Sequence, residues 1–177
     1  TYAESFIKKG TSLLEIAENI EKKVIEMGGK LAFPINLSVN EIAAHYTPTY
    51  NDETLASGLL KVDIGVHVDG WIADTAFSID LENSQENRKL IQAAQEALNE
   101  AIKTCKKDIE LCKIGRAIQD KIESYNFSPI KNLCGHEITP FKVHSGLTIP
   151  NYDNKNISKL KQGVYAIEPF APAGRGE

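Results

Sequence analysis

The sequence predicts an α+β fold, and three features carry this prediction. Apolar residues recur at helical spacing near the N-terminus and again in the middle of the chain. Between these segments lies a stretch of alternating side chains with an Asp-Gly pair at its centre, which is typical of an antiparallel hairpin. Helices that alternate with antiparallel hairpins favour α+β over a parallel α/β sheet.

The composition is that of a globular protein with one domain. The chain has 177 residues, of which 42% are hydrophobic and 25% charged, and its net charge is −4. We expect a single domain over residues 1–177. The sequence has no stripe of Lys and Arg residues of the kind that indicates nucleic-acid binding. No apolar run reaches the roughly 18 residues of a membrane span. Residues 1–10 lack the pattern of a signal peptide. We therefore expect neither a nucleic-acid nor a membrane partner.

The cysteines argue against a disulfide framework. There are three, Cys105, Cys112 and Cys134, with no close pair. A reducing location, the cytoplasm, is expected. Cys105 and Cys112 are seven residues apart, so we expect them on one face of a helix as small packing residues.

Helical segments are expected at three places along the chain. The first spans Tyr2–Met27, with a break and cap at residues 10–12 and an end at the glycine pair 28–29. The second spans Gln85–Lys106 and the third Ile114–Tyr125. The apolar faces of these helices are expected to pack against the apolar faces of the strands.

Strands are expected in the remaining periodic segments. Residues 60–80 predict a hairpin, and residues 133–147 and 163–170 predict two further strand regions. Residues 31–50 are mixed, with a short apolar stretch and no clear period. No low-complexity segment or linker divides the chain.

The hairpin admits two registers. With Asp69 and Gly70 as the two loop residues, Val68 faces Trp71 and Asp63 lies diagonally from Asp74. Sliding the loop back by one residue places the two aspartates directly opposite. In the first register one face is almost wholly apolar and is expected to pack on helices; it carries Val62, Ile64, Val66, Val68, Trp71, Ala73, Thr75 and Phe77.

Asp63 and Asp74 lie together in either register. Two neighbouring carboxylates repel, and one stays protonated unless a cation intervenes. A divalent metal is the simplest cation that both could share, and the small residues Gly65 and Ala76 would leave room for it. The alternative is two solvated aspartates on an exposed sheet face.

Three histidines and one glutamate have unusual contexts. His136 follows a glycine, His144 comes eight residues later, and His45 lies in an Ala-Ala-His-Tyr-Thr-Pro run. Glu168 follows an apolar strand and precedes a proline, where a buried carboxylate needs a partner. Each alone is more often structural. Together, two Asp, one His and one Glu are the ligand types of a hydrolytic site with two metals.

These motifs resemble those of the type 2 methionine aminopeptidases, within the creatinase-like or pita-bread group. The resemblance covers essentially the whole chain. It rests on residues 32–38, 43–48, 61–65, 74–77, 135–138, 143–146 and 166–170. It implies a pita-bread fold, in which two pseudo-symmetric α+β halves surround a dinuclear metal centre.

The resemblance also implies residue roles. The metal ligands would be Asp63, Asp74, His136 and Glu168, with Asp74 bridging two divalent ions of Co, Mn, Fe or Zn. His45 would lie beside the scissile bond, and His144 would contact the substrate and steady the tetrahedral intermediate. The pocket for the methionine side chain would be lined by Phe33, Val143 and Phe170. His67 matches no functional position and is expected to be structural.

The implied function is that of a metalloaminopeptidase. It would remove the N-terminal methionine from nascent proteins with water activated by two metals, as a cytoplasmic monomer. The family centre has a fifth ligand, a glutamate near the C-terminus. The chain ends nine residues after Glu168, so we expect the second half to be incomplete, without the type 2 helical insertion and the last metal-ligand strand. The alternatives are a non-enzymatic binding protein of the same fold and an Xaa-Pro aminopeptidase-like hydrolase.

Overall fold

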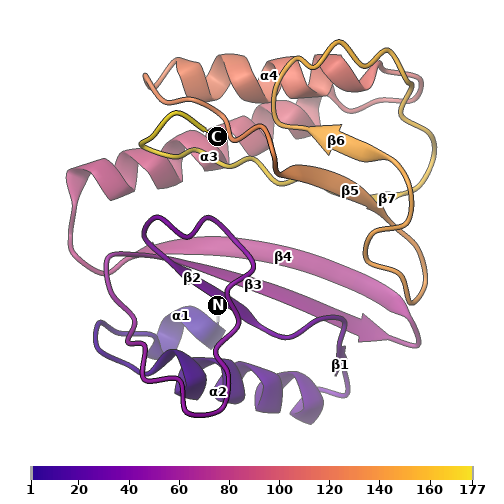
Figure 1. The fold of residues 1–177 in the computed structure, drawn as a ribbon. Coiled ribbons are helices and arrows are strands. Elements are labelled where there is room, and N and C mark those ends of the chain that lie inside the picture. Colours follow the sequence, from indigo (N-terminus) through magenta and orange to yellow (C-terminus); the bar gives the residue numbers. More distant parts are fainter. Residues whose placement is uncertain (1, 177) are drawn as a thin grey trace. The chain divides into compact units, whose positions relative to one another are not determined.

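The computed structural model describes residues 2–176, which divide into two compact units, Thr1–Asn87 and Arg88–Glu177. Each unit combines helices with an antiparallel sheet, as Figure 1 shows in sequence colours. The predicted α+β class is therefore confirmed. The helices that the structure describes include none that is long and apolar enough to cross a membrane.

The first predicted helix forms as two pieces, divided at the expected break. Helix α1 spans Tyr2–Phe6 and helix α2 spans Leu13–Glu26. The Ser12 hydroxyl accepts a hydrogen bond from the backbone N–H of Glu15 at 3.4 Å, which caps α2. Gly28 follows the helix with a φ of +85°, a conformation that favours glycine at a helix C-terminus.

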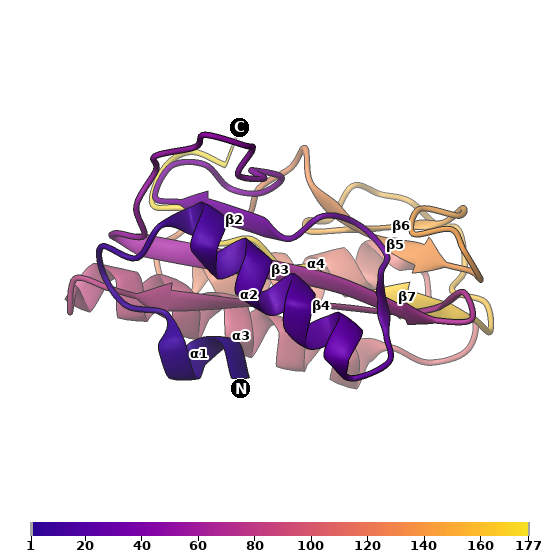
Figure 2. The same cartoon turned by 90° about the horizontal axis from the view of Figure 1, so that it is seen from below.

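The sheet of unit 1 is built around one long strand. Strand β3 (Leu59–Val68) pairs with β4 (Trp71–Asp80), and also with the short strands β1 (Lys30–Leu31) and β2 (Asn36–Val39). Helix α2 lies along one face of this sheet (Figure 2). The core between them is aliphatic and includes Leu13, Ile16, Ile20, Leu37, Leu60 and Val62.

The hairpin has the register that follows from an Asp-Gly turn. Val68 pairs with Trp71, and both loop residues have positive φ, +50° at Asp69 and +89° at Gly70, as a type I′ turn requires. The alternative register is wrong. The apolar face packs against the core only in part: Val68 and Trp71, beside the turn, are 59% and 67% exposed. Ala73 and Thr75, farther along β4, are exposed as well, so the exposed part of this face is not limited to the turn.

Unit 2 packs two helices against a three-stranded sheet. Helices α3 (Gln85–Thr104) and α4 (Leu111–Glu123) accompany strands β5 (Cys134–Ile138), β6 (Thr148–Pro150) and β7 (Val164–Ala166). The strand order is β6-β5-β7, with both pairings antiparallel. The core of this unit includes Ala97, Leu111, Ile114, Ile118, Ile122 and Ile149.

Two expectations for unit 2 need correction. The region 133–147 holds only the five-residue strand β5, because a tight Thr139–Lys142 bridge turns the chain and the rest is loop. Cys105 and Cys112 do not share a helix face, since Cys105 follows α3 and Cys112 belongs to α4. All three cysteines are free, and Cys105 packs on the core of unit 2.

Candidate metal centre

Unit 1 carries the aspartate pair. Asp63 on β3 pairs with Ala76, and Asp74 on β4 pairs with Gly65. The two aspartates are therefore diagonal neighbours on one face, with Cα atoms about 7–8 Å apart at most. Both are partly buried. The register therefore places both aspartates on one face of the hairpin, as its pattern predicted.

The two small residues beside this pair, Gly65 and Ala76, have different surroundings. The ring of Phe33 lies directly on Gly65, where any Cβ would overlap its Cε1 and Cδ1 atoms. The room expected at Gly65 is therefore filled by Phe33, which corrects that part of the prediction. Ala76, opposite Asp63, is exposed. The glycine instead lets an aromatic ring approach the hairpin that carries the aspartates, at a position that the resemblance assigns to the substrate pocket.

His45 lies in the loop that follows β2, in the same unit. It is exposed and has a φ of +67°, which is uncommon for a residue with a Cβ. His67 has a different environment, since its Nδ1 accepts a hydrogen bond from the backbone N–H of Gly70 at 3.2 Å. This bond joins His67 to the hairpin turn and agrees with the expected structural role.

Unit 2 carries a histidine and a carboxylate in direct contact. His136 on β5 is 6% exposed, and its Nε2 lies 2.8 Å from Oε1 of Glu168, two residues past β7. Two ligand atoms at about 2.1 Å from one ion, at a right angle, would be about 3.0 Å apart. The donor types and their separation therefore fit two ligands of a single divalent metal.

His144 lies against this pair. Its ring centroid is 4.3 Å from that of His136, and the two rings are inclined by 75°. The loop that carries His144 is attached to Glu137. The backbone N–H of Ser145 donates to the carbonyl of Glu137 at 2.9 Å, and that of Leu147 donates to Glu137 Oε2 at 3.2 Å. An exposed histidine is thus positioned beside a buried one.

Several residues of this arrangement were not found by sequence reasoning. Glu137 accepts a hydrogen bond from the backbone of Leu147 in the His144 loop. Tyr46, in the His45 loop, donates a hydrogen bond to Asp52. Their signals were weak: each is a polar residue directly after a candidate histidine. Val143 and Phe170 are partly buried in unit 2.

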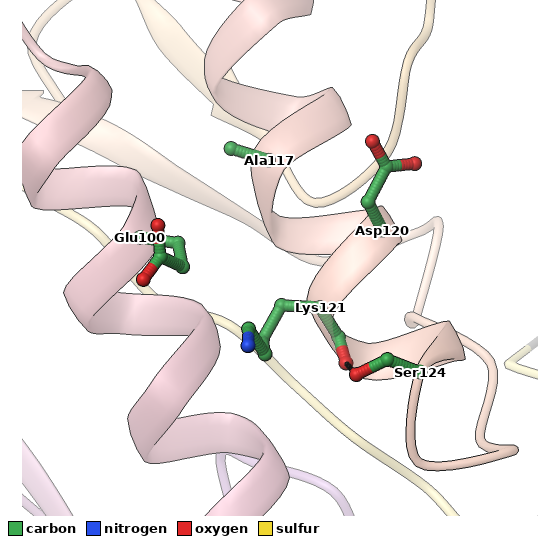
Figure 3. A pocket seen from close by; sticks show the side chains of 5 residues that line it. All are labelled: Glu100, Ala117, Asp120, Lys121 and Ser124. Carbon is green, nitrogen blue, oxygen red and sulfur yellow. Dashed lines mark hydrogen bonds between the residues drawn. The ribbon is translucent and has the colours of Figure 1, made fainter.

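A hollow elsewhere in unit 2 contains no predicted site residue. It lies between α3 and α4 and is lined by Glu100, Ala117, Asp120, Lys121 and Ser124 (Figure 3). The Lys121 Nζ is 3.5 Å from Glu96 Oε2. These residues form a solvated, charged helix surface and have no geometry for catalysis.

Comparison with known proteins agrees with the family that the sequence motifs resemble. Residues 1–176 match metallopeptidase family M24. The chain is 52% identical over 177 residues to a methionine aminopeptidase of Thermococcus onnurineus and 51% identical over 179 residues to one of Pyrococcus abyssi. The alignments cover 98% and 99% of this chain. They cover 59% and 60% of those proteins, so the chain spans about 60% of the length of these relatives.

The fold agrees with these relationships. A methionine aminopeptidase of Thermotoga maritima is 26% identical in sequence and superposes with a TM-score of 0.90. The similarity covers 99% of this chain and 75% of that one. The predicted pita-bread fold is confirmed, and the chain belongs to metallopeptidase family M24.

Proposed function

We propose that the protein is a methionyl aminopeptidase, which removes the N-terminal methionine from nascent proteins. The observation that carries the proposal is the 2.8 Å approach of His136 Nε2 to Glu168 Oε1 in a chain of a metallopeptidase family. In unit 1 the hairpin carries two neighbouring aspartates, whose oxygens are ligands of the required type. About 50% identity to proteins named methionine aminopeptidase supports this substrate over Xaa-Pro peptides.

Four side chains would hold the metals. Asp63, Asp74, His136 and Glu168 would supply the ligands of two divalent ions. Nitrogen and oxygen ligands without thiolates suit Co, Mn, Fe or Zn. When bound, such ions activate water as a nucleophile near neutral pH and polarise the carbonyl that it attacks.

The remaining residues would bind and orient the peptide. His45 would lie beside the scissile bond, and His144 would donate a hydrogen bond to the oxyanion of the tetrahedral intermediate. Packing against the buried His136 restricts the His144 ring, which would reduce reorganisation during the reaction. Phe33, Val143 and Phe170 would line an apolar pocket suited to an unbranched thioether.

The partners would be the N-terminal methionine peptides of new proteins, met in the cytoplasm by a monomeric enzyme. The three free thiols are consistent with a reducing compartment. Neither nucleic acid nor membrane would be required for the reaction.

The test uses protein from the full-length coding sequence, loaded with Mn, Fe, Co or Zn. Release of methionine from a Met-Ala-Ser peptide is compared with cleavage of an Ala-Pro-Ser peptide, with and without chelator. Asp74→Asn should abolish release of methionine. Asp69→Asn, at the turn of the same hairpin, should leave it unchanged because Asn also accepts positive φ.

Each result has a distinct meaning. Chelator-sensitive release of methionine that is lost in Asp74→Asn supports the proposal. Preferred cleavage of the Ala-Pro peptide would favour the Xaa-Pro hydrolase instead. No cleavage of either peptide with any of the four metals would favour a non-enzymatic binding protein.

A further inference from the structure

His45 has an unusual backbone conformation. Its φ of +67° lies in the left-handed region, which a residue with a Cβ occupies at a cost. Such conformations persist where the surrounding structure enforces them, and they concentrate at functional sites. The contacts that enforce this one should therefore matter for whatever His45 does.

The backbone of Tyr46 is attached to β2 on both sides. Its carbonyl accepts a hydrogen bond from the N–H of Leu37 at 2.7 Å, and its N–H donates to the Ser38 hydroxyl at 3.3 Å. Ser38 is only 1% exposed, so its hydroxyl is held in place by the core. The residue directly after His45 is thus joined to a strand.

A second attachment follows one residue later. The side-chain amide of Asn36 donates to the Thr47 hydroxyl at 3.0 Å and to the Pro34 carbonyl at 2.8 Å. Asn36 is the β2 residue that pairs with Asp63. The loop that carries His45 is therefore connected to the strand position beside a proposed metal ligand.

The Tyr46 side chain joins the loop to a second segment, which contains Asp52 and Thr54. Its hydroxyl donates to Asp52 Oδ2 at 2.6 Å and lies 3.1 Å from the Thr54 hydroxyl. Asp52 Oδ1 accepts the backbone N–H of Thr54 at 2.8 Å. Hydrogen bonds from Thr54 and Tyr46 lower the pKa of Asp52, so it remains an ionised acceptor near neutrality. A bond to an ionised acceptor is stronger than a neutral one.

We propose that Tyr46 is a positioning residue for His45, fixing its left-handed backbone by joining β2 on one side and Asp52 on the other. The proposal rests on the proposed function, because it assigns a purpose to the place of His45 beside the scissile bond. Tyr46 itself would not touch the substrate. It would act on the chemical step through the orientation of the histidine.

The experiment is a double-mutant cycle on metal-loaded protein from the full-length coding sequence. Tyr46→Phe removes the hydroxyl and keeps the ring. We expect kcat for a Met-Ala-Ser peptide to fall by about ten- to hundredfold, as small misplacements of catalytic groups do, with KM nearly unchanged. In a His45→Ala background the same substitution should cause no further loss, because the residue that it positions is gone.

Tyr50→Phe is the matched control. Tyr50 belongs to the same loop and is 89% exposed, so loss of its hydroxyl should leave kcat unchanged. Asp52→Asn removes the charge of the acceptor and should reduce kcat in the same direction as Tyr46→Phe. The kcat of Asp52→Asn tests the same contact if circular dichroism shows that Tyr46→Phe does not fold.

The outcomes separate this proposal from the proposed function. If Tyr46→Phe or Asp52→Asn lowers kcat by the same factor with His45 present and with His45→Ala, the positioning role is overturned. An unchanged kcat in Tyr46→Phe would overturn it as well. A His45→Ala protein with full aminopeptidase activity would instead overturn the proposed role of His45. Loss in the single variant that disappears in the double variant supports the proposal.

Discussion

His136 Nε2 lies 2.8 Å from Glu168 Oε1, and the two residues are brought together by the pairing of β5 with β7. His136 pairs with Ala166, so Glu168 comes two residues further along on the same side of the chain. A histidine and a glutamate 32 positions apart in sequence thus become neighbours through a three-residue strand.

Removal of His136 should release metal. His136→Ala is expected to weaken divalent-metal binding by at least about 100-fold, since even residues that only support a ligand cost 10–100-fold. Metal per chain is measured by elemental analysis after dialysis. His67→Ala is the matched histidine control: it should destabilise the hairpin turn by about 1 kcal/mol through loss of the bond to Gly70 and still retain its metal. Full metal occupancy in His136→Ala would contradict the assignment.

Gly135→Ala should destabilise the strand pair that positions His136. An added Cβ would overlap the backbone carbonyl of Ala166, which cannot move without separating β7 from β5. We expect a loss of about 1–3 kcal/mol in the free energy of unfolding, typical of overpacking, together with weaker metal binding. Urea denaturation measures the first effect and dialysis equilibrium the second.

The control for this variant is Gly174→Ala, where an added Cβ has no atom within 4 Å. Its stability should equal that of the unsubstituted protein. Equal stability of Gly135→Ala would mean that the two strands can separate freely, contrary to the close contact observed.

The hairpin could be predicted in detail because its information is local. A period of two set the faces, and the Asp-Gly pair limited the hairpin to two registers. Both registers place Asp63 and Asp74 together, and the structure has the one with Asp69 and Gly70 in the turn. Helices α2 and α3 could also be predicted, because apolar spacing marks both and Ser12 caps the start of α2. The start of α4 at Leu111, three residues before the expected one, has no side-chain cap to mark it.

The rest could not be predicted because it depends on contacts between distant residues. Nothing in the sequence near Gly65 indicates that the ring of Phe33 covers it. Likewise, no periodic pattern in the sequence indicates the hydrogen bond from Tyr46 to Asp52. The region 133–147 was predicted as strand, but Pro140 has no N–H for a sheet and the chain turns there.

A final prediction concerns pH and the loop that follows β6. Asp153 accepts hydrogen bonds from Lys155 Nζ at 2.8 Å and from Arg116 Nε on α4 at 3.1 Å. Its side chain is 13% exposed. The side chains of Lys155 and Arg116, and then the backbone N–H of Lys155, hold the pKa of Asp153 far below its usual range. The ionised carboxylate is thus favoured in the folded state.

The sign of the effect follows from linkage. Because the folded pKa is depressed, Asp153 contributes its full stability above the unfolded value of about 3.9 and loses it as pH falls toward the folded value. Asp153→Asn should therefore melt at a lower temperature than the unsubstituted protein at pH 6. The gap should narrow as pH falls from about 4 toward 2, because the unsubstituted protein loses the carboxylate contribution there.

Asp120→Asn controls for charge removal near the same arginine. Asp120 is 62% exposed and lies 3.9 Å from Arg116 Nη1, so its loss should change the melting temperature little at any pH. Melting is followed by circular dichroism from pH 6 to pH 2, always as the difference from the unsubstituted protein, so that other titrating groups cancel. A gap for Asp153→Asn that stays constant across this range would show that shape, and not the charge held by Arg116 and Lys155, stabilises the loop.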